Sequence, residues 1–389
     1  MKSISTALIA VIFSFFVMGF TDTVGIASNY VKSDLSLSDT EASVFMTMVF
    51  LWFLILSIPT SMLMNRIGRK NTALVSLLLM VVAFSVALLG NSYPIMIVAF
   101  TILGVANVLM QTSVNALMSN IVDRRNLESS LTFGQFVKSI ASFTAPYLAM
   151  WGAVELFPSF GLGWRVMFLI YAVMTALSLL MLLKTPIKEE APQAAANFKQ
   201  SVALLKDPFI LICFLGIISL VGVDVGTNSF APKILIERLN LTLGEAGFIT
   251  SLYFICRVSG CFLGSILLRH VSPKLLFGVS MLLMTFSMGG LFFASSLLSI
   301  YVCVGLVGLF NANAFPIVLS QALVHKPQNG NEISGLMMMG LIGGAIFPSL
   351  MGIMSDSVGL NGAVAVMMAG VLYLLFYTRV IRPSNKNLN

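Results

Sequence analysis

Long apolar runs separated by short polar turns are the main pattern along this chain of 389 residues. A helix that crosses a bilayer needs roughly 20 apolar residues, because the hydrocarbon core is about 30 Å thick and an α-helix rises about 1.5 Å per residue. Suitable runs fall near residues 5–31, 42–64, 71–89, 93–121, 129–152, 165–184, 208–236, 243–268, 274–294, 298–325, 332–355 and 360–381. The pattern therefore predicts an all-α membrane protein with twelve transmembrane helices.

The twelve predicted helices form two pseudo-repeats of six. The sequences after Asp22 and after Asp224 both continue with a glycine, a short stretch rich in Leu and Ser or Thr, and a Glu-Ala pair. The repeat predicts an N-terminal half over 1–184 and a C-terminal half over 207–389. The stretch 185–206 between them is rich in charge and proline, and is predicted to be a linker.

Lysine and arginine are unevenly divided between alternate loops. One set of loops holds Arg66, Arg69, Lys70, Arg124, Arg125, Lys184, Lys188, Lys199, Lys206, Arg269, Lys274 and Lys326. The other set holds chiefly Lys32, Arg165, Lys233 and Arg238. Because cytoplasmic loops of membrane proteins are enriched in Lys and Arg, both termini and the linker are predicted to be cytoplasmic, in a cell inner membrane.

Composition supports the membrane class and excludes several others. Hydrophobic residues make up 58% of the chain and charged residues only 10%, against roughly 25% charge in a soluble domain. The net charge of +7 lies in loops rather than in a basic stripe, so nucleic acid is not an expected partner. The four cysteines lie in apolar runs without zinc-ligand spacing, and no catalytic cluster is visible. We expect no metal, no cofactor and no enzymatic activity.

A loop motif carries the first family resemblance. The loop after the second predicted helix reads Asn65-Arg66-Ile67-Gly68-Arg69-Lys70. It resembles the loop signature of the major facilitator superfamily, which usually begins with an acidic residue where this chain has Asn65. The resemblance implies the major facilitator fold and transport by alternating access. The departure at Asn65 weakens the expectation of a gating salt bridge at this position.

Further segments resemble a narrower group, the fucose–galactose–glucose–hexose symporters, also called the L-fucose permease group. They are Ile342-Gly-Gly-Ala-Ile-Phe-Pro348, Gln111-Thr-Ser-Val-Asn115-Ala, Ala314-Phe-Pro-Ile-Val-Leu-Ser320 and Phe254-Ile-Cys-Arg257-Val-Ser-Gly260. The resemblance implies a proton-coupled sugar symporter. The group's fourth-helix acid, a candidate proton carrier, is Gln111 in this chain, so coupling is expected to use another group.

Four charged residues lie well inside predicted helices: Asp22, Lys138, Asp224 and Arg257. Each costs at least about 2.5–3.5 kcal/mol on insertion scales, so such residues usually serve transport or form fixed structural pairs. Arg257, on the next helix, is a plausible partner for Asp224, and Lys138 is the best partner for Asp22. Asp22 and Asp224 occupy equivalent places in the two halves, which favours a transport role and makes both candidates for proton coupling.

Neutral polar side chains complete the predicted substrate site, because amides donate and accept hydrogen bonds as sugar hydroxyls require. With Lys138, Asp224 and Arg257, the candidates are Gln111, Asn115, Gln135, Asn228, Asn311 and Asn313. Bonds between helices, worth about 0.6 kcal/mol each, are the competing interpretation. The aromatic residues Trp52 and Tyr253 are interpreted as packing rather than as sugar-stacking residues.

We interpret the chain as a secondary active transporter that imports a small polar solute, chiefly a monosaccharide, with a proton. It is expected to act as a monomer in the lipid bilayer. One alternative is an anionic or amino-substituted sugar, or another organic anion, held by Lys138 and Arg257, with sodium as a possible coupling ion. A drug exporter is a weaker alternative. A receptor or membrane enzyme would need a soluble domain or a catalytic cluster, and neither is visible.

Overall fold

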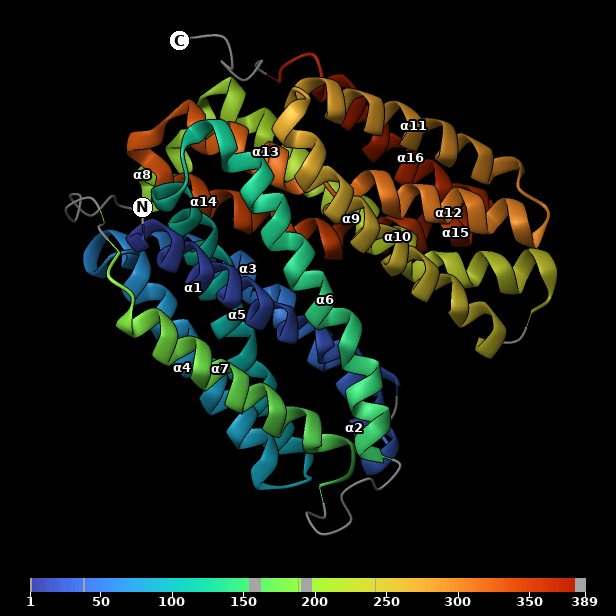
Figure 1. The fold of residues 1–389 in the computed structure, drawn as a ribbon. Coiled ribbons are helices and arrows are strands. Elements are labelled where there is room, and N and C mark those ends of the chain that lie inside the picture. The colour runs from blue at the N-terminus through green and yellow to red at the C-terminus, as the bar shows by residue number, and fades with distance from the viewer. Residues whose placement is uncertain are drawn as a thin grey trace. The chain divides into compact units, whose positions relative to one another are not determined.

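A computed structural model describes residues 2–37, 39–153, 162–187, 189, 198–241 and 243–381. Every regular element in these residues is a helix (Figure 1). Eleven of the described helical segments are long and apolar enough to cross a membrane. The remaining predicted span, 129–152, is present as the continuous helix α6 (Leu127–Ala153), which includes the polar residues Glu128, Gln135 and Lys138. Lys188, Glu190 and Pro192 of the predicted linker lie outside the described residues.

The helices pack into two units, each built mainly from one half of the chain. Unit 1 comprises Met1–Val122, Val137–Ser201 and Gly330–Met339. Its helices are α1 (Lys2–Met18), η1 (Gly19–Thr23), α2 (Val24–Leu35), α3 (Asp39–Ile67), α4 (Arg69–Leu89), α5 (Tyr93–Ile121), the later part of α6, α7 (Val166–Lys184), the first four residues of α8 (Phe198–Ala203) and α14 (Gly330–Met339). The halves predicted from the sequence repeat, 1–184 and 207–389, remain a prediction. The units are defined by helix packing instead, and their boundaries differ from those of the repeat.

Unit 2 comprises Asp123–Phe136, Val202–Asn329 and Gly340–Asn389. Its helices are the start of α6, α9 (Pro208–Leu239), α10 (Leu243–His270), α11 (Pro273–Phe293), α12 (Leu297–Asn311), α13 (Ala314–His325), η7 (Gly340–Ile342), α15 (Gly343–Val358) and α16 (Leu360–Tyr377). Close backbone contact holds α15 against α9. A side chain at Gly343 would meet the Ile218 carbonyl oxygen at 2.1 Å, so only glycine fits there.

The fifth helix of each repeat contributes its first turns to the other unit. In the first repeat, residues 123–136 belong to unit 2, while the rest of α6 belongs to unit 1. In the second repeat, α14 belongs to unit 1, while α15, which continues the same span after η7, belongs to unit 2. Within unit 1, α14 packs against α3 and α5. Each unit therefore depends on a segment from the other half of the sequence.

Two predicted spans are interrupted at candidate site residues. The first span changes at η1, which carries Asp22, from α1 to α2. The tenth is divided into α12 and α13 at Asn311 and Asn313. Irregular backbone at membrane depth occurs only where it is buried in protein or lines a cavity. These breaks therefore place backbone polar groups beside the predicted polar side chains, as half-helices do in many transporters.

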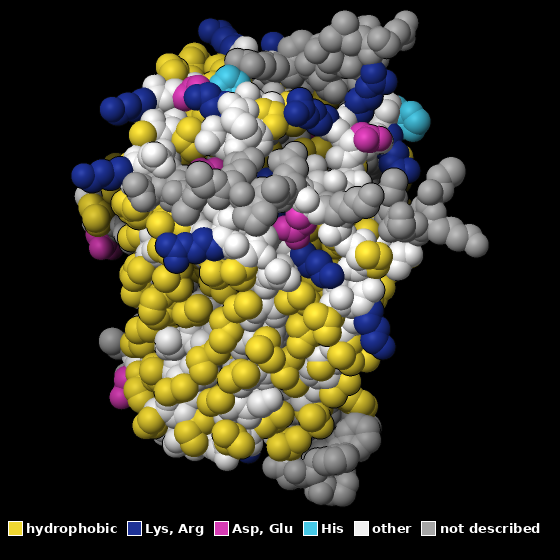
Figure 2. Space-filling model, turned by 90° about the vertical axis from the view of Figure 1, so that its left-hand side faces the viewer, with side chains coloured by type: hydrophobic (Ala, Val, Ile, Leu, Met, Phe, Trp, Pro, Cys, Tyr) yellow, Lys and Arg dark blue, Asp and Glu magenta, His cyan; other side chains and the backbone are white. Residues whose placement is uncertain are grey.

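Outward-facing apolar side chains on α4 and α7 form a surface suited to lipid. The exposed large hydrophobic residues on these two helices include Val75, Leu78, Val82, Leu169, Val173, Leu177, Leu180 and Leu183. The three- and four-residue spacing puts those of each helix on one face. Figure 2 shows hydrophobic side chains over much of the visible surface, with Lys and Arg gathered toward one end. The surface fits a bilayer rather than water.

The N-terminus of α9 is held by the side chain of Asp207. Its Oδ1 accepts hydrogen bonds from the backbone N–H of Phe209 at 2.9 Å and of Ile210 at 3.4 Å. Its Oδ2 lies 2.7 Å from Lys326 Nζ and 3.1 Å from His325 Nε2, at the end of α13. Hydrogen bonding from Lys326, and then from His325 and the two backbone groups, holds the pKa of Asp207 well below its usual range.

We expect Asp207→Ala to lower stability at pH 7 by about 1 kcal/mol, the usual loss for an N-cap. Because folding lowers the pKa of Asp207, its contribution is present above the unfolded-state pKa of about 3.9 and is lost as the pH falls toward the folded-state value. The difference in stability between the parent protein and Asp207→Ala should therefore shrink below about pH 4. Thermal unfolding in detergent checks this. Asp356→Ala, which alters an exposed aspartate, serves as the control. Equal midpoints for Asp207→Ala and the parent at pH 7 would contradict the assignment.

Candidate functional site

In unit 1, Asp22 is paired with a cation and a hydroxyl from α6. Lys138 Nζ lies 3.2 Å from Asp22 Oδ1, and Ser142 Oγ donates to Asp22 Oδ2 at 2.9 Å. Lys138 and Ser142 are four residues apart, so they lie on one face of the helix. The approach is close because Gly19 has no side chain: a Cβ there would meet the Lys138 carbonyl oxygen at 2.3 Å. The predicted pairing of Asp22 with Lys138 is confirmed.

In unit 2, Asp224 of α9 is held by two donors from α10. Arg257 Nη1 lies 2.6 Å from Asp224 Oδ2, and the Tyr253 hydroxyl donates to Asp224 Oδ1. The Asp224 side chain is 13% exposed, whereas that of Asp22 is 40% exposed. The predicted pairing with Arg257 is confirmed, and Asp224 is the more tightly enclosed of the two aspartates.

Tyr253 has a role that the sequence interpretation missed. It was expected to be packing, and its ring is buried against α12 at Gly308. Its hydroxyl nevertheless joins the ion pair of Asp224 and Arg257. The signal was available: Tyr253 precedes Arg257 by four residues, so both side chains reach the same neighbour. Trp52, the other aromatic residue considered, packs on Gly104 as expected for a packing residue.

The two amides predicted on the fourth transmembrane helix lie together on α5. Gln111 Nε2 donates to Asn107 Oδ1 at 3.1 Å, and Asn115 Nδ2 donates to the Gln111 carbonyl oxygen at 2.7 Å. Asn107 was not predicted, although it lies one turn before Gln111. Asn115 is fully buried beside Met338 of α14, and its Oδ1 has no hydrogen-bond partner among the described residues. This leaves acceptor capacity free along one face of α5.

The other predicted amides lie in unit 2. Asn311 donates to the Leu220 carbonyl oxygen at 3.4 Å, and Asn313 donates to the Gly260 carbonyl oxygen at 3.1 Å. Both bonds join separate helices, as the competing interpretation expects. Asn228 is half-buried on α9, one turn after Asp224, and Gln135 is half-buried in the part of α6 that belongs to unit 2. Asn311 also lies beside Tyr253, which connects it to the Asp224 cluster.

The predicted loop motif forms a compact junction. Gly68 has φ of 89° and separates α3 from α4, a conformation that favours glycine. Glu189 accepts from the backbone N–H of Arg69 at 2.7 Å and of Lys70 at 2.5 Å, so it caps α4. Lys70 Nζ in turn donates to carbonyl oxygens at the end of α7. The side chain of Arg66 is exposed.

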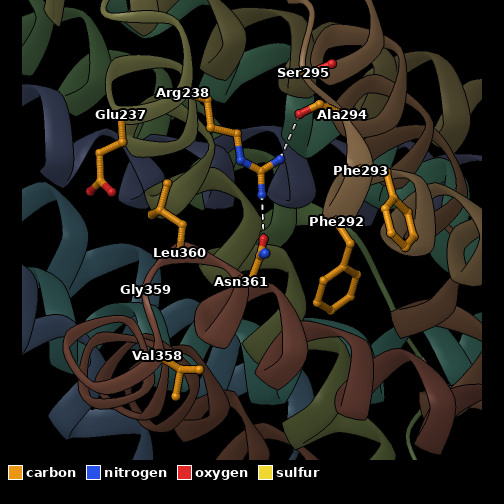
Figure 3. Close-up of a pocket in the computed structure, with 10 residues that line it drawn as sticks. All are labelled: Glu237, Arg238, Phe292, Phe293, Ala294, Ser295, Val358, Gly359, Leu360 and Asn361. Atoms are coloured by element: carbon orange, nitrogen blue, oxygen red, sulfur yellow. Dashed lines mark hydrogen bonds between the residues drawn. The ribbon is translucent and has the colours of Figure 1, made fainter.

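A cleft of about 530 Å³ opens in unit 2, away from all predicted site residues. It is lined by Glu237, Arg238, Phe292, Phe293, Ala294, Ser295, Val358, Gly359, Leu360 and Asn361 (Figure 3). Arg238 donates to the carbonyl oxygens of Leu291 and Ala294 and to Asn361 Oδ1. Its guanidinium therefore caps the C-terminus of α11, and we interpret Arg238 as a structural residue.

Comparison with known proteins identifies a matching family and similar transporters. The family model described as Major Facilitator Superfamily matches residues 7–242 and 214–389. A glucose/galactose transporter from Brucella abortus is 23% identical over 397 residues, which cover 97% of this chain and 94% of the relative.

Solved structures show the same fold. The E. coli fucose:proton symporter superposes with a TM-score of 0.85 at 16% identity, covering 98% of this chain and 99% of that chain. A proton:xylose symporter bound to 6-bromo-6-deoxy-D-glucose gives a TM-score of 0.76 at 14% identity, covering 98% of this chain and 96% of the other. The predicted all-α fold of two six-helix repeats is confirmed.

We expect Tyr253→Phe to destabilise the protein by about 1.5–3 kcal/mol, the usual range for a hydrogen bond to a charged group. The variant leaves the ring in place and removes only the donor to Asp224. Thermal unfolding of the purified protein measures the effect. Tyr301→Phe is the matched control, because the structure describes no hydrogen bond for that hydroxyl. A loss no larger than that of Tyr301→Phe would return Tyr253 to a packing role.

Proposed function

This chain belongs to the major facilitator superfamily, and from that premise we propose that it imports a monosaccharide together with a proton. The observation that supports this proposal most directly is that both aspartates inside the helices are paired with cations. The side chains of Asp22 and Asp224 are each neutralised by a cation of the same unit, at 3.2 Å and 2.6 Å. Neutral amides are then left for the solute. The family and fold are those of transporters rather than enzymes.

A neutral hydroxylated solute fits these groups better than an anionic one. Lys138 and Arg257 were the counter-charges considered for an organic anion, and both already contact an aspartate. An anion would have to displace a paired carboxylate, which leaves a buried charge without a partner. Gln111, with Asn107 and Asn115 beside it, instead offers amide groups that donate and accept. The names of the relatives, as glucose/galactose transporters, support a hexose.

Asp22 is the better candidate for the coupling proton. Its carboxylate is 40% exposed and its contact with Lys138 is the longer of the two ion pairs. Asp224 has two donors at close range and is more enclosed, so its charge is stabilised more permanently. In our proposal, protonation of Asp22 frees Lys138 during each transport cycle, and the two halves alternate access to the solute. The protein acts as a monomer in the inner membrane, with both termini cytoplasmic.

We expect Gln111→Ala and Asn115→Ala to weaken hexose binding roughly three- to tenfold each, because each removes hydrogen bonds to the solute. Calorimetry on purified protein measures the affinity. Ser85→Ala is the control, since this exposed hydroxyl on α4 bonds only its own helix. Unchanged affinity in both amide variants would assign these side chains to helix packing.

Asp22→Asn mimics the protonated acid, so it should abolish uphill uptake driven by a pH gradient. Hexose binding and exchange across the membrane should persist, because neither step moves a net proton. Proteoliposomes with imposed pH or sodium gradients give the measurement. Accumulation by the Asn variant would show that Asp22 does not carry the proton. Accumulation that follows sodium in the parent protein would refute proton coupling itself.

A further inference from the structure

Glu332 differs from the other buried carboxylates of unit 1 and unit 2. It lies in the first turn of α14 and is 3% exposed. Its Oε1 accepts from Asn65 Nδ2 at 2.5 Å, while its Oε2 is buried without a hydrogen-bond partner among the described residues. No described Lys, Arg or His forms an ion pair with it. A buried carboxylate normally requires such a partner or several donors.

Arg69 is the nearest cation in the network, and two amides separate it from Glu332. Arg69 Nε donates to Asn331 Oδ1 at 2.6 Å, and Asn331 Nδ2 donates to Asn65 Oδ1 at 2.6 Å. Asn65 then donates to Glu332. The guanidinium also bonds the Ala116 carbonyl oxygen and the Asn120 side chain. Arg69 therefore orders the chain of amides but does not neutralise the carboxylate directly.

The elements packed against α14 provide few other charges. The last turn of α3 carries Arg66, which is exposed, and its first turn carries Asp39 and Glu41. The start of α4 adds Lys70, which bonds the end of α7. No Lys, Arg, Asp, Glu or His occurs in the sequence of α5, whose one tyrosine, Tyr93, is its first residue.

The positive end of the α14 dipole and the Asn65 amide both favour an ionised Glu332. Each of these effects is smaller than the cost of burying a carboxylate without a cation. The observed contacts provide only one donor: Oε1 accepts from Asn65, and no described donor faces Oε2. The comparison with Glu128 is instructive, because this residue occupies the first turn of the fifth helix of the first repeat. Glu128 is 5% exposed but has an interaction partner.

We propose that Glu332 is a proton-binding residue, protonated while α14 packs against α3 and ionised when α14 moves away. The contact between these helices is close: a Cβ at Gly335 would meet Ser61 Cβ at 2.8 Å, and Ser61 is fully buried. Movement of α14 would admit water to Glu332, which then releases its proton to that water. Proton binding and the packing of α14 are thereby linked, in addition to any coupling through Asp22.

The first test detects the proton directly. Infrared difference spectra of the purified, solute-free protein between acidic and basic pH should show the carbonyl band of a protonated carboxylic acid. Glu332→Gln should remove this band, and Glu128→Gln should leave it in place. A band that survives in Glu332→Gln, or that disappears only in Glu128→Gln, would overturn the proposal.

The second test follows α14 itself. A cysteine at Ser61, beneath α14, should react with a small thiol reagent faster as the pH rises, by up to about tenfold per pH unit across the titration beyond the rise due to thiolate formation. In the Glu332→Gln background only the rise that every thiol shows as its thiolate forms should remain. Asn65→Asp should move the transition to higher pH, because two adjacent carboxylates resist joint ionisation. The protein with only its native cysteines gives the background rate.

A pH response of the Ser61 cysteine that persists unchanged in Glu332→Gln would also overturn the proposal. If Glu332→Gln does not fold, the Asn65→Asp shift decides the matter, and an unshifted transition refutes it. The inference rests on the proposed function only in requiring that α14 moves during transport. Both tests are made without solute, so their failure is distinguishable from failure of hexose uptake or binding.

Discussion

A charge inside a bilayer has no water to stabilise it, so it must find its partner within the protein. This constraint explains the arrangement of both candidate sites. Asp22 meets Lys138 and Ser142, while Asp224 meets Arg257 and Tyr253. In each unit one helix supplies the cation and the hydroxyl with a spacing of four residues. Each unit therefore has two of its helices joined by an ion pair and a hydroxyl group.

The same constraint acts on the backbone. Helices satisfy their own polar groups, and the structure interrupts them at few places. Two interruptions carry or adjoin candidate residues, at η1 with Asp22 and at the junction of α12 with α13. Gly19 permits the first by allowing α6 to approach without a side chain between them. Polar side chains and freed backbone groups thus occur together, which suits recognition of hydroxyl groups more than packing alone would require.

The exchange of fifth-helix segments adds a mechanical link to this chemistry. The segment α14 comes from the second half of the chain but packs within unit 1, where it covers Asn115 and meets Asn65. A movement of α14 would therefore alter the amides of α5 and the loop motif together. The position where the family pattern has an acid is Asn65 here, and the carboxylate at this junction is supplied by Glu332 instead.

The sequence by itself determined the spans, the repeat and the two ion pairs. Length and hydropathy decide which segments cross a bilayer, and the high cost of an isolated charge makes Asp22 with Lys138 and Asp224 with Arg257 the natural pairings. Tertiary structure decided what depends on helix rotation and contact across the chain. In the sequence, Tyr253 was interpreted as a packing aromatic residue, and only the structure shows that its hydroxyl donates to Asp224. Asn107 could not be distinguished in the sequence from the other polar residues of its helix. Glu332 and Asn65 are 267 residues apart, and no periodic pattern connects them. Hydrophobicity acts on each segment separately, whereas these contacts exist only after the helices have packed.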